Sequence, residues 1–144
     1  MMTISLSGVS VFRLSTLAAA CFLLTACPRV PAELDPVEEA VFRIEACEGE
    51  HFQALIADPE VIQEAEQLIG AQEQRLIIGE LRRGNGGFNA PWSWHMDPQT
   101  VHFADVTMEL CDACPHMVEE GLDYWLDTVG NFCPWTTRVV ERVR

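Results

Sequence analysis

Apolar and polar side chains alternate along residues 40–46 and again along residues 52–56. Every second residue is apolar in both segments, which is the period of a β-strand with one face against a core and the other in water. Glu48 and Gly49 fall between the segments and predict a tight turn. The pattern therefore predicts a β-hairpin whose inward face is made of Ala40, Phe42, Ile44, Ala46, Phe52, Ala54 and Ile56.

The spacing of apolar residues changes from two to the helical period over residues 57–70. Asp58 is a favourable N-cap, Pro59 suits the first helical position, and Glu60 complements the helix dipole. Gly70 ends the segment where a left-handed residue is needed. We predict a helix here, with one apolar face made of Val61, Ile62, Ala65, Leu68 and Ile69.

The rest of the chain predicts three more strands and a second helix. RLIIGEL (75–81) is typical of a strand buried on both faces, and TTRVVERV (136–143) of a final strand. VHFADVTMEL (101–110) also alternates, with one change of phase that a β-bulge would absorb. Pro115 opens the second helix and Gly130 closes it.

The order strand, strand, helix, strand, strand, helix, strand predicts the fold class. We expect a single small α+β domain with a mostly antiparallel sheet of about five strands and two helices packed on one face. An even number of cysteines in the domain predicts that it is also braced by disulfides.

The N-terminus has the pattern of an export signal. Residues 14–24 form an uncharged apolar run after Arg13, long enough for the core of a signal peptide and too short to span a bilayer. The run leads into Leu24-Thr25-Ala26-Cys27, which resembles the lipobox of bacterial lipoproteins. We predict a signal peptide at 1–26, lipid on Cys27, a proline-rich tether over 27–37, and the domain at 38–144.

This anatomy predicts an exported lipoprotein held on a membrane of the bacterial cell envelope by its N-terminal lipid. Pro28, next to the lipidated cysteine, is compatible with transfer to an outer membrane. Without residues 1–26 the chain keeps 8 of its 9 basic residues and all 22 acidic ones, so its net charge changes from −13 to −14. Nucleic acid is therefore a poor partner.

Two scarce residue types exclude or disfavour several enzyme classes. The chain has no lysine, which excludes a phosphate-loop lysine, a Schiff-base lysine and a Ser-Lys dyad. Beyond the signal only Ser93 remains, and its context PWSWH lacks the nucleophile elbow of serine hydrolases.

Four cysteines lie in the predicted domain: Cys47, Cys111, Cys114 and Cys133. Four cysteines allow three connectivities, and long-range pairing is favoured because a bridge between Cys111 and Cys114 would close a very small loop. The Cys-x-x-Cys spacing also permits a zinc site or a thiol oxidoreductase. The neighbouring carboxylates of Glu109 and Asp112 oppose the redox interpretation, since they would raise a thiol pKa.

A second candidate site lies in WSWHMDPQTVH, residues 92–102. Two imidazoles and several carboxylates there and just beyond could hold zinc or calcium: His95, Asp97, His102, Glu109 and Asp112. The alternative is that the tryptophans fill the core and His95 bonds to a turn. The sequence has no helical His-x-x-x-His pair and no calcium-loop pattern. We therefore expect that the protein binds no cofactor, with zinc or calcium as the alternative.

WSWHMDPQTVHFADVTMELCDA, followed by FCPW, resembles the BP-seventy-four-related N-terminal domain, a family of small secreted proteins. The resemblance extends from about Glu39 to the C-terminus and includes DPEVIQEAEQLIG and IIGEL. It implies a fold and a secreted setting rather than a reaction. It also implies a bridge between Cys111 and Cys133, with Cys47 and Cys114 forming an additional one.

Three functions remain open from the sequence. The first is a non-catalytic binding or interaction module for an unknown protein or small molecule, with the 84–92 loop and Trp92, Trp94, His95 and Asp97 as contact residues. The second is a metal-binding domain or metal-dependent enzyme that uses His95, Asp97, His102, Glu109 or Asp112. The third is a thiol oxidoreductase at Cys111 and Cys114.

Overall fold

A computed structural model describes residues 39–71 and 75–144 of the chain. The predicted signal peptide, the lipidated Cys27 and the tether over 27–37 lie outside these residues and stay predictions. No helix within the described ranges is long and apolar enough to cross a membrane.

The predicted hairpin forms part of the first of two antiparallel sheets. Strands β1 (Ala40–Ala46) and β2 (Glu50–Ile56) pair from Ala40 opposite Ile56 to Ala46 opposite Glu50. Strand β7 (Thr137–Arg142) pairs with the other edge of β1, which gives the strand order β2-β1-β7. The predicted hairpin is thus confirmed, and its inward-facing side chains are buried.

The turn between β1 and β2 has unusual backbone angles. Cys47, Glu48 and Gly49 all have positive φ, at 46°, 56° and 112°. This left-handed region is disfavoured for Cys47 and Glu48 because their Cβ atoms crowd the following carbonyl. The pairing of β1 with β2 holds the turn in this conformation, because it continues up to Ala46 opposite Glu50.

Helix α1 (Pro59–Leu68) forms where the sequence predicts it. The Asp58 carboxylate accepts a hydrogen bond from the Glu60 amide at 2.8 Å, which is the predicted N-cap. The helix buries Ile62 and Ala65 and packs against β7, β2 and β5.

The second sheet is built on the long strand β3 (Leu76–Arg83). Its first half pairs with β5 (His102–Ala104), its second half with β4 (Trp94–Met96), and its middle with β6 (Asn131–Phe132). All three pairings are antiparallel. One long strand thus serves as a base for three short ones.

The predicted second helix is divided into three segments. Helix α2 (Pro115–Glu120) ends at Gly121, α3 (Leu122–Tyr124) makes a single turn, and η2 (Trp125–Val129) is a π-helical turn. Gly130 ends the run with φ 77°, as its position predicts. A short 3₁₀ turn, η1 (Glu109–Cys111), precedes α2.

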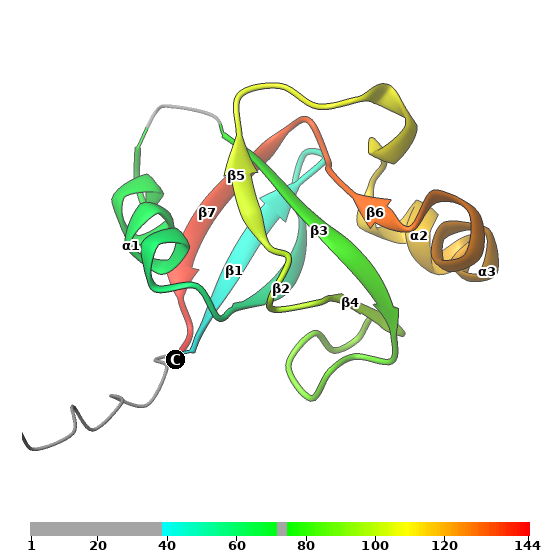
Figure 1. Ribbon diagram of the computed structural model, residues 1–144, viewed down its shortest axis with the longest axis horizontal. Coiled ribbons are helices and arrows are strands. Elements are labelled where there is room, and N and C mark those ends of the chain that lie inside the picture. The colour runs from blue at the N-terminus through cyan, green and yellow to red at the C-terminus, as the bar shows by residue number, and fades with distance from the viewer. Residues whose placement is uncertain (1–38, 72–74) are drawn as a thin grey trace, which may run out of the picture. The chain divides into compact units, whose positions relative to one another are not determined.

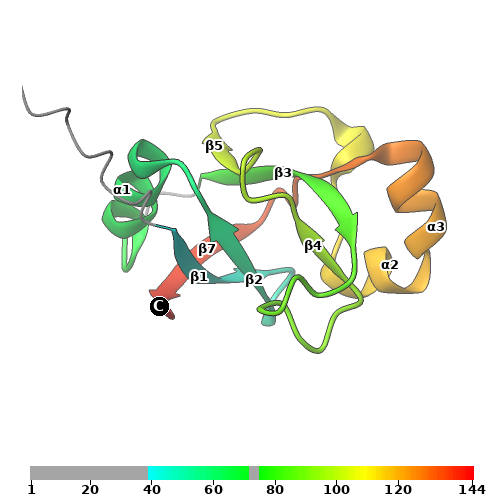
Figure 2. The same ribbon diagram turned by 60° about the horizontal axis from the view of Figure 1, so that its bottom comes forward.

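Aromatic side chains join the two sheets at the centre of the core. The ring of Phe52 from β2 lies 5.7 Å from that of Trp94 on β4 and 5.5 Å from that of Phe132 on β6. Trp94 and Phe132 are 5.1 Å apart in an edge-to-face arrangement. The core therefore lies between the sheets, with α1 at one end and α2 and α3 at the other (Figures 1 and 2).

The antiparallel, disulfide-braced α+β class is confirmed, while its finer details differ from the expectation. Within the described residues seven strands form two sheets instead of about five in one, and the helices lie at opposite ends instead of on one face. The two extra strands, β4 and β6, have three and two residues, too few for alternation to reveal them. The strand expected over 101–110 ends at Ala104.

Candidate functional site

The four cysteines of the domain form two long-range disulfides. Cys47 bonds to Cys114, 67 residues away, and Cys111 bonds to Cys133, 22 residues away. This is the pairing that the family resemblance implies. Because Cys111 and Cys114 belong to different bridges, the Cys-x-x-Cys segment does not form a dithiol pair of its own in this structure.

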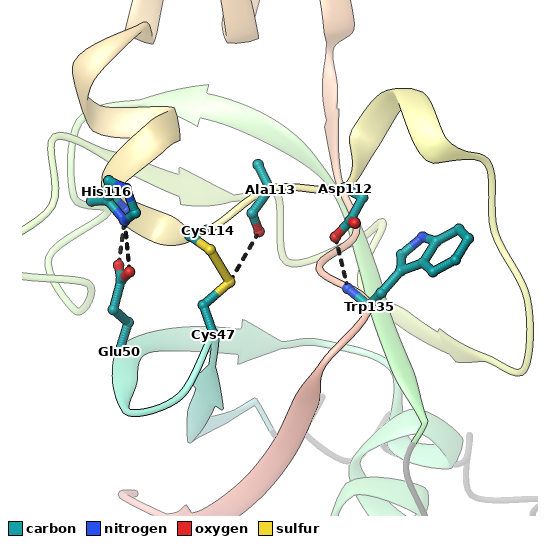
Figure 3. The surroundings of a disulfide bond; sticks show 7 residues. All are labelled: Cys47, Glu50, Asp112, Ala113, Cys114, His116 and Trp135. Carbon is teal, nitrogen blue, oxygen red and sulfur yellow. Dashed lines mark hydrogen bonds and ion pairs between the residues drawn. A yellow bond between two sulfur atoms is a disulfide. The ribbon is translucent and has the colours of Figure 1, made fainter.

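The Cys47–Cys114 bridge joins the tip of the β1–β2 hairpin to the start of α2 (Figure 3). Next to it the Glu50 carboxylate holds His116 with both oxygens: Oε2 accepts from the backbone N–H at 3.0 Å, and Oε1 lies 2.6 Å from Nδ1. Both cysteines are half-buried. The hairpin tip and the helix start are therefore joined by one covalent and two polar contacts.

A broad cavity of about 990 Å³ opens beside this bridge. Its ionisable lining comes from the hairpin, from α2 and from β7: Glu45, Glu48, Glu50, His116 and Arg138. Arg138 donates a hydrogen bond to Glu45 at 2.6 Å, and this contact lowers the pKa of the Glu45 carboxyl. Carboxylates thus outnumber cations around the cavity.

On its other side the Cys-x-x-Cys segment contacts the chain that leads into β7. The Asp112 carboxylate accepts a hydrogen bond from the Trp135 backbone N–H at 3.0 Å (Figure 3). The Cys133 N–H donates to the Cys111 carbonyl at 2.9 Å. Asp112 thereby anchors a neighbouring segment.

The side chains expected to bind metal do not gather in one place. His95 Nδ1 donates to the Gly84 carbonyl at 2.6 Å, and His102 Nδ1 to the Thr100 carbonyl at 2.9 Å. Within the described residues one group of three His, Cys, Asp or Glu side chains has ligand atoms within 4.8 Å of one another, and it consists of Glu50, Cys114 and His116. The set predicted around residues 92–112 contributes no member to it: His95, Asp97, His102, Glu109 and Asp112 all lie outside this group.

The expected aromatic contact surface needs a correction at Trp94. Its side chain is 0 % exposed and packs against Phe52 and Phe132, so it cannot meet a partner. Trp92 is half-buried, and its Nε1–H donates to the His51 carbonyl on the outer edge of β2 at 2.9 Å. The 84–92 loop therefore covers a sheet edge with this side chain, which protects the edge from pairing with other strands.

His95 and Asp97 also make contacts within the fold. The rings of His95 and Phe88 lie in an edge-to-face arrangement with their centroids 5.5 Å apart. Asp97 forms an ion pair with Arg82 at 2.9 Å and accepts from the Gln99 amide at 3.1 Å. Glu80 and Asp97 beside Arg82 raise the pKa of its guanidinium. These partners account for both predicted contact residues without a ligand.

The segment after β5 shows a surface that sequence reasoning missed. Val106, Met108 and Leu110, which we call the apolar row, are 82 %, 66 % and 59 % exposed. Their alternation resembles that of a strand, which is why the sequence predicts a strand there. Met108 and Leu110 also line a cavity of about 230 Å³ together with Ile78 of β3 and Val129 of η2.

Together the fold and these sites define a small, disulfide-braced α+β domain with an acidic cavity at one bridge and an exposed apolar row beside the other. The family model of the BP-seventy-four N-terminal domain matches residues 38–144, and the chain belongs to that family. Comparison with curated proteins and with solved structures finds no match.

Proposed function

We propose that this protein is an exported, lipid-anchored interaction module that acts by binding another protein through the apolar row. The observation that carries the proposal is the exposure of three large aliphatic side chains within five residues. Burying one such side chain contributes about 2 kcal/mol of favourable free energy. A partner that covers these side chains would therefore gain binding free energy. Exposed apolar patches with polar rims are typical of interaction sites.

The segment that carries the apolar row is held by the fold at both ends. At its start, β5 pairs with β3, and at its end Cys111 is bonded to Cys133. A segment held at both ends loses little conformational entropy on binding, which favours affinity. The adjoining cavity of about 230 Å³ offers room for an apolar side chain of the partner.

The charges around the apolar row favour a cationic partner. Asp105 precedes the apolar row, Glu109 lies within it and Asp112 follows it, and all three are exposed. Asp105 also forms an ion pair with Arg75 at 3.2 Å. The whole chain carries −13, which attracts basic segments and repels acidic ones. The partner that fits is a peptide segment with a large apolar side chain next to arginine or lysine.

Selection of random peptides displayed on phage against the purified protein tests this binding. The proposal expects enriched peptides that combine apolar and basic residues, and at least about tenfold weaker binding to Met108→Ser/Leu110→Ser. Met117→Ser is the matched control, because Met117 is also exposed but lies on α2. Absence of enrichment, or equal binding by the two variants, would contradict the proposal.

Anchorage is the second part of the proposal. Two disulfides are compatible with an oxidising envelope, and the N-terminal sequence supplies the lipobox cysteine. Metabolic labelling with an alkyne fatty acid should mark the wild-type protein in the membrane fraction and leave Cys27→Ser unlabelled. An unlabelled wild-type protein would overturn the anchor and leave the binding surface untouched.

A further inference from the structure

The Cys47–Cys114 bridge lies beside a group of side chains that could hold a metal ion. One oxygen of Glu50, a ring nitrogen of His116 and Sγ of Cys114 are all within 4.8 Å of one another, and Cys47 Sγ is bonded to Cys114 Sγ. Two sulfurs, one imidazole and one carboxylate are a donor set that suits tetrahedral zinc. As a disulfide the sulfurs carry no negative charge and do not bind a metal.

We propose that reduction of the Cys47–Cys114 bridge creates a zinc site made of Cys47, Cys114, His116 and Glu50. A dithiol reductant attacks one sulfur, the S–S bond breaks, and the second thiol of the reductant releases the mixed disulfide. The reductant leaves as a disulfide, and Cys47 and Cys114 become thiols. Zn²⁺ then displaces their two protons and binds the thiolates.

The geometry before reduction is close to what zinc requires. Zn–S bonds of about 2.3 Å and Zn–N bonds of about 2.0 Å place neighbouring ligand atoms roughly 3.3 to 3.8 Å apart in a tetrahedron. The ligand atoms of Glu50, His116 and Cys114 lie within 4.8 Å of one another, and breaking the S–S bond frees Cys47 Sγ to become the fourth ligand. Thiolate ligands favour zinc over calcium, which prefers oxygen.

Zinc would connect the same two elements that the disulfide connects. Cys47 and Glu50 belong to the hairpin, and Cys114 and His116 to the start of α2 (Figure 3). Seven residue pairs between β1 and β2 fix the hairpin independently of the bridge. The metal therefore replaces a covalent cross-link with a coordinate one, and it binds only when the bridge is open.

The experiment compares oxidised and reduced protein in zinc binding and thermal unfolding. The intact protein is reduced with a phosphine, freed of metal, and titrated with Zn²⁺ and with Co²⁺, whose absorption reports thiolate ligands in a tetrahedral site. We expect one ion per reduced chain, a higher Tm with zinc, and neither effect in the oxidised protein. Binding by the oxidised protein, or none by the reduced protein, would overturn the proposal.

Variants assign the ligands. His116→Ala and Glu50→Gln should each weaken zinc binding at least about tenfold, while His102→Ala, an exposed histidine on β5, should leave it unchanged. Reduction also opens Cys111–Cys133, so the Cys111→Ser/Cys133→Ser variant should still bind zinc and Cys47→Ser should not. Should the double variant fail to fold, the histidine and glutamate variants decide alone: equal affinity in His116→Ala and wild type overturns the site.

Discussion

The buried side chain of Asn89 accepts a hydrogen bond from the backbone N–H of Gln53, with 2.6 Å between Oδ1 and N. The same side chain donates through Nδ2 to the Trp94 carbonyl at 2.9 Å. Gln53 lies on β2 in the first sheet and Trp94 on β4 in the second. One amide side chain thereby joins the outer edge of β2 to the other sheet and occupies the place of a neighbouring strand.

Replacing Asn89 by alanine should destabilise the domain by about 3 kcal/mol, because it leaves a donor and an acceptor without partners in a buried place. Chemical denaturation measures the change. Asn85→Ala is the control, since its side chain accepts from the Gly87 amide in an exposed part of the same loop. Equal effects of the two substitutions would show that Asn89 does not join the sheets.

Loss of the Cys47–Cys114 bridge should cost more stability than loss of Cys111–Cys133. The loops span 67 and 22 residues. Chain entropy then gives about 4 kcal/mol for the longer loop and about 3 kcal/mol for the shorter. Denaturation of the two double-alanine variants without reductant tests the order, and the reverse order would contradict the entropic account.

Glu48→Asn should stabilise the domain by about 0.5 to 1 kcal/mol, since asparagine tolerates the left-handed conformation better than glutamate. Glu48 is exposed and has φ 56°. Glu39→Asn removes the same charge from another exposed position and should stabilise less. Equal gains in denaturation midpoint would assign the effect to charge instead of backbone strain.

Trp135 should account for most of the tryptophan fluorescence that acrylamide quenches. Its side chain is 43 % exposed, while Trp94 and Trp125 are buried and Trp92 is half-buried. Trp135→Phe should therefore remove most of the quenchable emission, and Trp125→Phe should leave it. Strong quenching that persists in Trp135→Phe would contradict this prediction and show that tryptophans of the 92–95 segment are accessible to solvent.

Acid should weaken the domain partly through Glu45. The hydrogen bond from Arg138 lowers the pKa of Glu45 from its ordinary 4.5, so the folded state favours the carboxylate. This contribution is present above the ordinary pKa and is lost as pH falls through the lowered value. Glu45→Gln should therefore lose less stability than wild type between neutral and acidic pH, as measured by denaturation at each pH. An unchanged pH profile in Glu45→Gln would contradict the assignment.

Sequence reasoning predicts best where local pattern and local chemistry act together. The hairpin, α1 with its Asp58 cap and the end of the helical run at Gly130 are all confirmed, since each depends on residues within one or two turns. It fails over 105–110, where alternation predicts a strand although the chain leaves its partner β3 after Ala104. Alternation shows that two faces differ, but it does not show that a neighbouring strand is present.

The candidate sites divide in the same way. His116 follows Cys114 by two residues and Glu50 follows Cys47 by three, yet nothing in either spacing shows that the pairs meet, because 67 residues separate the cysteines. Conversely, His95 and His102 are near in sequence, but each bonds to a different backbone carbonyl. Proximity in sequence is therefore a poor guide to a site assembled from a hairpin tip and a helix start.

The sequence by itself determined the α+β class, the antiparallel hairpin, the capped helix, the acidic charge and, through its family resemblance, the disulfide pairing. Only the tertiary structure decided that Trp94 fills the core, that Asn89 and Trp92 cover the edge of β2, and that Val106, Met108 and Leu110 stay exposed. The physical reason is that side-chain period and capping depend on neighbours along the chain, whereas burial and ligand geometry depend on which distant segments the sheets bring together.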